Sequence, residues 1–348
     1  MRKIILFAAC LLCLTARQAS AQESSNHNHN TVTRLENEIL IFQRLQDVAY
    51  VDYVRLAGPP KAVQKKNGCE FQDTLSNNDF KFYAYVFIPK SVKQNRKYPL
   101  VMLTHGGVHG NFSQVMVHFV RELVAQGYIV AATDYRGSTG YGKGTYEAID
   151  YGGLENEDVL ATRDYMVECY SIVDSSRVGL LGWSHGGMIS LMNILRYPDK
   201  YACAYAGVPV SDVAYRLSYQ HPSYIGNFNQ PYHIGGTPQE KPEEYARRSP
   251  VSYAKLLSKP LMITTCINDD DVSWTEVNRM IEALKAENKE FSYKIYPPMA
   301  GAHLFERMDM KECSDIRFET YRFLAKYLKP GHPFKNTDEL RAAGYYFY

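Results

Sequence analysis

From Phe80 onward, apolar strand-like runs alternate with segments of helical periodicity. The strand-like runs are short and almost continuously apolar, as in strands that are buried on both faces. A chain with this alternation is expected to form a mainly parallel sheet covered by helices on both faces. The expected strands are residues 80–89, 100–103, 128–133, 178–182, 202–207, 261–266 and 291–296, and the expected helices are 112–126, 155–168, 185–196, 274–287 and 312–329.

Residues 1–21 have the three parts of a secretory signal peptide. A basic start is followed by an apolar run over residues 4–14 and by a small-x-small site that ends at Ala21. The apolar run is shorter than the roughly 20 residues that cross a bilayer. We therefore expect cleavage after Ala21, export to the periplasm or the extracellular space, and no membrane span in the mature chain. Lipoprotein anchoring through Cys10 or Cys13 is the alternative.

Residues 22–79 separate this segment from the expected sheet. Residues 22–31 predict a polar, flexible leader, and residues 58–78, which are rich in Gly, Pro, Asn and Lys, predict a loop. Between them, apolar residues recur at helical spacing and predict a helix from Val32 to about Val54 that packs on the main body. The apolar residues are Leu35, Ile39, Phe42, Leu45 and Val48.

The remaining residues, 80–348, are expected to form one domain. Within it, residues 209–260 interrupt the alternation of strands and helices and are rich in Tyr, Pro and Gly. We expect this insertion to form a helical cap over the carboxyl edge of the sheet.

The charge balance argues against nucleic acid as a partner. Lys and Arg total 39, Asp and Glu total 37, and no long run of one sign occurs. No Cys or His spacing predicts a metal site, and we expect no metal and no other cofactor. Cys203 and Cys266 lie in apolar strand-like runs and are expected to be buried thiols. No residue pattern specifies an oligomeric state.

Ser184 is the candidate nucleophile. It lies in Gly182-Trp183-Ser184-His185-Gly186, between an expected buried strand and an expected helix. A Gly-x-Ser-x-Gly sequence in this context is the nucleophile elbow of the α/β-hydrolase fold, in which a sharp turn exposes the Ser hydroxyl above the sheet. The sequence therefore predicts an α/β-hydrolase fold with Ser184 at the carboxyl edge of the sheet.

The partners of Ser184 follow in the chain order that this fold uses. His303 lies between the last expected strand and the last expected helix and is the candidate general base. Three carboxylates, Asp269, Asp270 and Asp271, follow the strand at 261–266. The first of them is best placed to reach the following loop, so Asp269 is the expected orienting acid, with the other two as alternatives.

An oxyanion hole needs two donors near Ser184. One is expected to be the backbone N–H of His185. The other is expected to come from the turn His105-Gly106-Gly107, where Gly106 lets the main chain approach a substrate closely.

Several segments in this order resemble the catalytic domain of the prolyl oligopeptidase family of serine peptidases, over about residues 80–328. The resemblance implies Ser184, Asp269 and His303 as a catalytic triad, and substrate contacts by His105, Tyr135, Tyr141 and Asp271. The segments are 105–107, 135–142, 182–187, 234–238 through 248–250, and 268–272.

Two departures from the family pattern bear on the substrate. Larger family members carry a propeller domain before this domain, and residues 22–79 are too few to form one, so we expect no propeller. Many relatives have Arg or Asn directly before the Val of the acid segment, in contact with a substrate carbonyl, where this chain has Asp271. Pro-specific dipeptidyl cleavage is therefore not predicted.

The expected activity is hydrolysis of peptide or aminoacyl bonds through an acyl-enzyme on Ser184. A carboxylesterase that acts on small acyl esters is the alternative, because the same groups cleave esters. A non-catalytic binding protein is disfavoured, since binding would not require Ser, Asp and His together. The expected partner is thus a peptide or a small acyl substrate.

Overall fold

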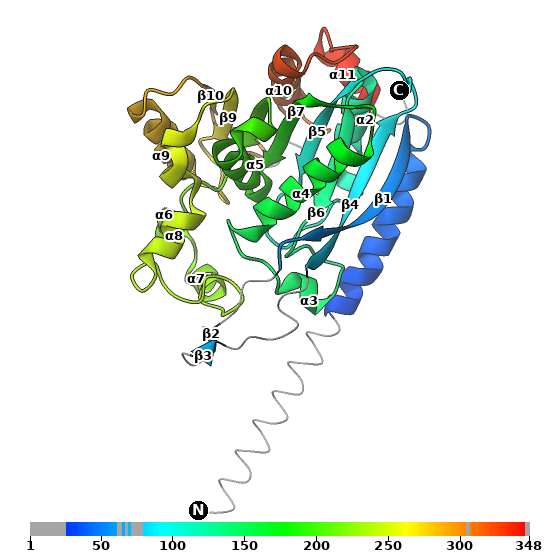
Figure 1. Cartoon of the computed structure of the whole chain (residues 1–348). Helices are drawn as coiled ribbons and strands as arrows, with labels where there is room; N and C mark the ends of the chain where they lie inside the picture. The colour runs from blue at the N-terminus through cyan, green and yellow to red at the C-terminus, as the bar shows by residue number, and fades with distance from the viewer. Residues whose placement is uncertain (1–25, 61–64, 67–68, 71–78, 304–306, 345–348) are drawn as a thin grey trace, which may run out of the picture.

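The computed structural model describes residues 26–60, 65–66, 69–70, 79–303 and 307–344 (Figure 1). Within these residues the main feature is an eight-stranded sheet in the order β1-β4-β6-β5-β7-β8-β9-β10. The expected signal peptide, residues 1–21, lies outside the described residues. The strands of the sheet are β1 (Ala49–Gly58), β4 (Phe80–Pro89), β5 (Tyr98–Thr104), β6 (Ile129–Asp134), β7 (Val173–Trp183), β8 (Cys203–Gly207), β9 (Leu261–Cys266) and β10 (Ser292–Tyr296).

The sheet changes direction at β4. This strand pairs antiparallel with β1 and with β6, whereas every pair from β6 across to β10 is parallel. The prediction of a mainly parallel sheet is confirmed. Because parallel strands end at the same edge, the loops that follow β5, β6, β7, β9 and β10 meet there, at the edge where open α/β sheets bind their ligands.

The strands place side chains alternately in two apolar clusters, one on each face of the sheet. In β5, Leu100 and Met102 belong to one cluster, and Val101 and Leu103 belong to the other. This two-sided burial explains why the strands read as continuous apolar runs.

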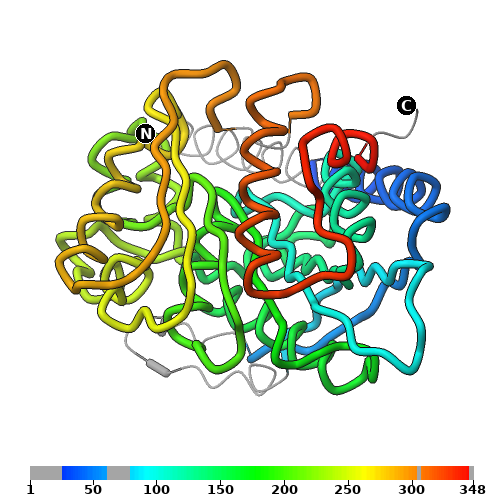
Figure 2. Tube along the Cα trace, turned by 90° about the horizontal axis from the view of Figure 1, so that it is seen from above, coloured from blue at the N-terminus to red at the C-terminus, as the bar shows by residue number. Residues whose placement is uncertain are grey.

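Helices cover both clusters, and Figure 2 shows the last of them, α11, lying against α2. The first cluster is covered by α4 (Leu154–Cys169), α5 (His185–Arg196) and α9 (Trp274–Ala286). The second is covered by α2 (Val117–Gln126), α10 (Lys311–Leu328) and α11 (Thr337–Gly344). Of these helices, α11 is the one that the sequence pattern did not predict.

The expected elements of the main domain agree closely with the structure. The predicted bounds match β4, α5 and β9, and the other predicted strands and helices differ mainly at their ends. The expected helix at 112–126 begins with a short 3-10 turn, η1 (Gln114–Met116), before α2. Cys203 and Cys266 are buried free thiols, as predicted. Within the described ranges, no helix has both the length and the apolarity needed to cross a membrane.

The segment before β4 departs from its prediction. A helix covers residues 26–45, including part of the expected polar leader, and residues 49–54, expected to be helical, belong to β1. Val51, Tyr53 and Val54 favour an extended chain, and the antiparallel partner β4 satisfies their backbone groups. The sheet therefore begins before residue 80, where the sequence predicts the start of the main domain, because β1 is one of its strands.

The helix over residues 26–45 buries only part of the predicted apolar face: Leu45 belongs to that face, and Ile41 does not. Ile41 and Leu45 are fully buried, whereas Leu35, Ile39 and Phe42 are 47%, 60% and 37% exposed. Helical periodicity in a sequence indicates an apolar face but not the surface that it meets.

The insertion at residues 209–260 is helical, as predicted. Its elements are α6 (Val213–Tyr219), α7 (Pro222–Phe228), α8 (Pro242–Arg248) and the 3-10 helix η3 (Pro250–Leu256). Two shorter helices are α3 (Lys143–Tyr146) and the 3-10 turn η2 (Pro198–Lys200), and a small hairpin pairs β2 (Lys65–Lys66) with β3 (Cys69–Glu70). Arg216 of α6 contacts Asp271 after β9, so the insertion lies beside the loops at the carboxyl edge (Figure 1).

Candidate active site

Ser184 occupies a strained turn between β7 and α5. Its backbone has φ of 58° and ψ of −127°, and a positive φ is uncommon for a residue that carries a Cβ. Its N–H donates to the carbonyl oxygen of Gly207 at 2.9 Å, which fixes the turn against the neighbouring strand β8. This strand-turn-helix geometry is that of a nucleophile elbow.

Glycines on both sides of Ser184 allow β5 to pack closely against the turn. A Cβ on Gly182 would lie 2.0 Å from Oγ1 of Thr104, and a Cβ on Gly186 would lie 2.2 Å from the carbonyl oxygen of Thr104. Only glycine fits at such distances. The two glycines of the Gly-x-Ser-x-Gly motif are thus required by the packing against β5 as well as by the turn.

The structure brings His303 and Asp269 into contact. We term residues 267–273, between β9 and α9, the acid loop, and residues 297–303, after β10, the histidine loop. Nδ1 of His303 lies 2.8 Å from Oδ2 and 3.0 Å from Oδ1 of Asp269. Oδ1 of Asp269 also accepts the N–H groups of Asp271 and Val272 at 3.0 and 2.9 Å. The main chain of the acid loop therefore holds the Asp269 carboxylate against the imidazole.

Both ring nitrogens of His303 face a carboxylate, since Nε2 lies 3.3 Å from Oδ2 of Asp271. Burial, the largest influence on this imidazole, would lower its pKa. The hydrogen bond and the charge of Asp269, together with the charge of Asp271, outweigh burial and raise the pKa of His303 above its ordinary value of 6.5.

Ser184 and His303 line one pocket of about 260 Å³ at the carboxyl edge. His105, Gly106 and Asp271 line the same pocket, so the structure gathers residues from three separate loops there. Its volume lies just below the range of about 300–1,000 Å³ that is usual for small-molecule sites. The other lining residues are Gly107, Asn111, Ser113, Val115, Met116 and Trp183.

The two expected oxyanion donors both lie next to Ser184. His185 begins α5, and the first N–H groups of a helix have no partner within the helix. Gly106 approaches closely, because a Cβ built on it would lie 3.3 Å from Cβ of Ser184. Both main-chain groups are therefore near the position where a negative oxygen would develop if Ser184 attacked a carbonyl.

Tyr135 lies beneath the turn of residues 105–107 rather than in the pocket lining. Its side chain is fully buried, and its hydroxyl donates to the carbonyl oxygens of His105 and Gly107 at 3.0 and 3.2 Å. These two carbonyls flank Gly106. The structure thus gives Tyr135 a supporting position under the turn, and the direct substrate contact that the resemblance implies for it stays a prediction.

The His105 ring is part of the same support. It is 2% exposed, stacks on Tyr135 with ring centroids 4.2 Å apart, and places Nε2 3.1 Å from Oγ of Ser138. Burial lowers the pKa of His105 to about 4, so the ring is neutral near pH 7. Because the ring is buried and contacts Tyr135 and Ser138, the backbone of His105 is more available than its imidazole to a ligand in the pocket.

Tyr141 also lies away from the pocket lining. Its hydroxyl donates to Asp134 and lies 2.7 Å from the hydroxyl of Tyr53 on β1. Arg34, from the helix over residues 26–45, lies over its ring and donates to the carbonyl oxygen of Gly140 at 3.0 Å. Tyr141 therefore joins the loop after β6 to the N-terminal helix, a role that sequence spacing did not indicate.

The imidazole of His185, directly after Ser184, is buried against Glu155. Nε2 of His185 lies 3.3 Å from Oε1 of Glu155, whose carboxylate also accepts the N–H groups of Gly152 and Gly153. Burial would raise the pKa of Glu155, but the contacts with His185 and with its backbone partners lower it overall. Glu155 is thus an ionised anchor beneath the start of α5.

Sequence reasoning assigned no role to Asn268 and Asp134. The Asn268 side chain donates to the carbonyl oxygen of Met299 at 3.0 Å and accepts the N–H of Met299 at 2.9 Å, so it joins the acid loop to the histidine loop. Asp134 accepts the N–H of Phe112 at 2.6 Å, and burial raises the pKa of its carboxyl to about 7. Asp134 is the last residue of β6, and Asn268 lies two residues after the end of β9. Position at the carboxyl end of a strand is a signal that could have identified both residues.

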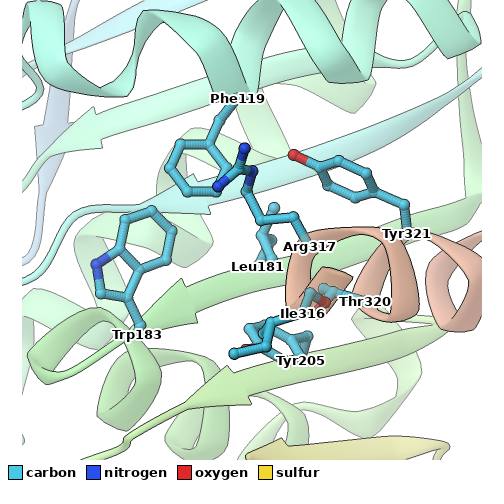
Figure 3. A pocket seen from close by; sticks show the side chains of 8 residues that line it. All are labelled: Phe119, Leu181, Trp183, Tyr205, Ile316, Arg317, Thr320 and Tyr321. Carbon is cyan, nitrogen blue, oxygen red and sulfur yellow. Dashed lines mark hydrogen bonds between the residues drawn. The ribbon is translucent and has the colours of Figure 1, made fainter. Parts of the chain in front are cut away.

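Trp183, the residue before Ser184, packs into the second apolar cluster, which α2, α10 and α11 cover (Figure 3). Its ring stacks on Phe119 of α2 with centroids 4.7 Å apart. A cavity of about 10 Å³, hardly larger than one water probe, lies between these rings and the buried Arg317 and Tyr321 of α10 (Figure 3). The strand β7, which ends directly before Ser184, is therefore supported by an almost fully packed layer.

No group of three or more His, Cys, Asp or Glu side chains is arranged to hold a metal ion in the part of the chain that the structure describes. The candidate site consists of a hydroxyl, an imidazole, carboxylates and main-chain N–H groups.

Curated relatives match about two thirds of this chain or more. Dipeptidyl peptidase 8 of Mus musculus is 28% identical over 251 residues, which cover 66% of this chain and 26% of the relative. Dipeptidyl aminopeptidase BIII of Pseudoxanthomonas mexicana is 27% identical over 269 residues, which cover 72% of this chain and 39% of the relative. The acylamino-acid-releasing enzyme of Rattus norvegicus is 28% identical over 233 residues. The matched region thus spans well under half the length of these relatives.

Solved structures show the same fold. An acylaminoacyl peptidase of Pyrococcus horikoshii superposes with a TM-score of 0.67 at 19% identity, over 86% of this chain and 45% of that chain. A puromycin hydrolase superposes with a TM-score of 0.65 at 21% identity, over 81% of this chain and 40% of that chain. The expected α/β-hydrolase fold is confirmed.

The family model described as the prolyl oligopeptidase family matches residues 113–331, well over half of the chain. This range contains Ser184, Asp269 and His303. The resemblance noted on short motifs therefore holds across the main domain, and the chain belongs to the prolyl oligopeptidase family of serine hydrolases.

Proposed function

We propose that this protein is a serine peptidase that cleaves peptide or aminoacyl bonds through an acyl-enzyme on Ser184. One observation carries the proposal: Ser184, on a strained turn, shares a pocket with His303, whose Nδ1 is held by the buried carboxylate of Asp269. A hydroxyl, an imidazole and an orienting carboxylate at the carboxyl edge are the groups that nucleophilic acyl transfer requires.

In the proposed reaction, the hydroxyl oxygen of Ser184 bonds to the substrate carbonyl carbon while Nε2 of His303 takes the hydroxyl proton. Asp269 holds the proton on Nδ1 and stabilises the imidazolium that forms. The N–H of His185 and a main-chain N–H of the turn at Gly106 stabilise the oxyanion. The imidazolium then protonates the leaving amine, and a water molecule repeats the cycle to release the acyl group.

The substrate class rests on the relatives. The relatives named above are a dipeptidyl peptidase, a dipeptidyl aminopeptidase and an acylamino-acid-releasing enzyme, and all these names describe release of small units from a peptide. We propose a peptide or aminoacyl substrate on this basis. Export through the signal-like residues 1–21 is part of the proposal, since their basic start, apolar run and small-x-small site fit a cleaved leader.

A fluorophosphonate probe and a substrate panel test the proposal. The probe is expected to label Ser184 in the wild type and to leave Ser184→Ala unlabelled, while far-UV circular dichroism shows that both proteins are folded. The panel compares aminoacyl and dipeptidyl anilides with simple acyl esters. Labelling at another residue would overturn the nucleophile, whereas turnover confined to the esters would overturn the peptidase assignment alone.

A further inference from the structure

The carboxylate of Asp271 lies in the pocket of Ser184, beside the imidazole of His303. The Asp271 side chain is 51% exposed and lines the pocket of Ser184, yet Oδ2 lies 3.3 Å from Nε2 of His303. Nε2 is the atom that must accept the Ser184 proton in the proposed reaction. A carboxylate beside Nε2 attracts the imidazole only when that nitrogen carries a proton.

The main chain of Asp271 has hydrogen bonds of its own, besides those of its carboxylate. Its carbonyl oxygen accepts hydrogen bonds from Nη1 of Arg216 at 3.1 Å and from Nε2 of Gln220 at 2.6 Å. The backbone of the acid loop at this position is therefore held by Arg216, which lies in α6, and by Gln220, which directly follows α6. Replacing the side chain leaves these two contacts in place.

The Asp271 carboxylate itself has two partners. Oδ1 accepts from Nη2 of Arg216 at 2.9 Å, and Oδ2 faces His303. Arg216 is buried and always charged, so its attraction for the carboxylate does not change with pH. The attraction of His303 does change, because it exists only for the imidazolium.

Of the charged groups near His303, Asp271 is the one whose carboxylate lies beside Nε2. Asp269 occupies Nδ1, and Arg216 of α6 acts in the opposite sense to the two carboxylates. Arg307, beyond the histidine loop, pairs with Asp309.

We propose that Asp271 is a positioning residue that competes with Ser184 for Nε2 of His303. Below the pKa of His303, the Asp271 carboxylate pairs with the imidazolium and holds Nε2 away from the nucleophile. As the pH rises and the proton leaves, this ion pair disappears, Asp271 stays with Arg216, and Nε2 is free to accept the Ser184 proton. The inference rests on the proposed function and differs from the substrate contact that the family resemblance implies for this position.

The pH dependence of kcat/KM is the first test, on Asp271→Asn and Asp271→Ala. Removing the charge is expected to move the acidic midpoint down by about half to one pH unit, in line with a partly solvated neighbouring charge. One unit below the wild-type midpoint, kcat/KM then rises about three- to fivefold. The plateau at high pH stays within about twofold, because the ion pair is absent there.

Asp270→Asn is the matched control. It removes the same charge from the adjacent, exposed residue of the same loop and is expected to move the midpoint much less. Equal shifts in the two variants would mean a general effect of loop charge and would overturn the proposal. A rise in KM at every pH with no shift of the midpoint would also overturn it and would favour a substrate contact.

Nuclear magnetic resonance titration separates this inference from the proposed function. The His303 imidazole is followed in Ser184→Ala protein and assigned by its loss in His303→Gln. Adding Asp271→Asn is expected to lower the pKa of His303 by the same half to one unit, and adding Asp270→Asn is not. This titration needs no catalysis, so it decides the role of Asp271 even if the probe fails to label Ser184. An unchanged His303 titration overturns the competition.

Discussion

Nδ1 of His303 lies within 3.0 Å of both carboxylate oxygens of Asp269, and the side chain of Asp269 is fully buried. Among the three consecutive carboxylates of the acid loop, this is the one whose oxygens also accept main-chain N–H groups of that loop. The contact assigns the orienting position to Asp269 on geometric grounds.

Asp269→Asn is expected to lower kcat by roughly 10⁴-fold while the protein stays folded. An amide can still accept the two loop N–H groups, but it presents its NH₂ group to Nδ1 and so favours the wrong imidazole tautomer. Steady-state kinetics and thermal unfolding check both parts. If Asp270→Asn lost as much turnover at saturating substrate, Asp269 would not be the orienting acid.

The wild-type activity is expected to rise with pH along one ionisation whose midpoint lies above 6.5. His303 must be neutral at Nε2 to accept a proton, and its pKa is raised because the Asp269 and Asp271 carboxylates favour the charged ring more than burial disfavours it. The acidic limb therefore moves upward in pH relative to a free imidazole. A kcat/KM profile checks this, and a midpoint clearly below 6.5 would contradict it.

Tyr135→Phe is expected to lower kcat about tenfold with little change in KM. The variant removes the hydroxyl that holds the carbonyls of His105 and Gly107, so the oxyanion donor at Gly106 loses its support without being removed. The free energy of unfolding falls by about 1–2 kcal/mol, because two carbonyl groups lose a buried donor. Tyr98→Phe, at the other end of β5, is the control and should leave kcat unchanged. A large rise in KM would instead indicate a substrate contact by Tyr135.

Asn268→Ala is expected to lower kcat by about tenfold and the free energy of unfolding by about 1 kcal/mol. The side chain makes two hydrogen bonds to Met299, four residues before His303, and each such bond contributes roughly 0.5–1.5 kcal/mol. Losing them loosens the histidine loop relative to Asp269. Turnover and urea unfolding are measured together, and a variant with normal kcat but reduced stability would show that the link does not position His303.

Local sequence determined most of the architecture. Strands that are buried on both faces of a sheet read as continuous apolar runs, and a nucleophile elbow needs small residues on both sides of the serine. The strands β4 and β9 and the turn at Ser184 could therefore be identified from neighbouring residues alone. The order of Ser184, Asp269 and His303 along the chain was informative for the same reason. Each residue follows a strand whose carboxyl end reaches the same edge of a parallel sheet.

Tertiary structure decided the contacts between segments far apart in the chain. Helical periodicity marked Leu35, Ile39, Phe42 and Leu45 as an apolar face. The helix over residues 26–45 buries only Leu45 of these four, together with Ile41, because the shape of the sheet surface selects which side chains fit. In the same way, the sequence identified Tyr135 and Asp271 as polar groups near the site. Only the tertiary structure shows that the Tyr135 hydroxyl contacts the turn of residues 105–107 and that the Asp271 carboxylate lies beside Nε2 of His303. Such contacts depend on how separate loops pack, and they leave no local pattern in the chain.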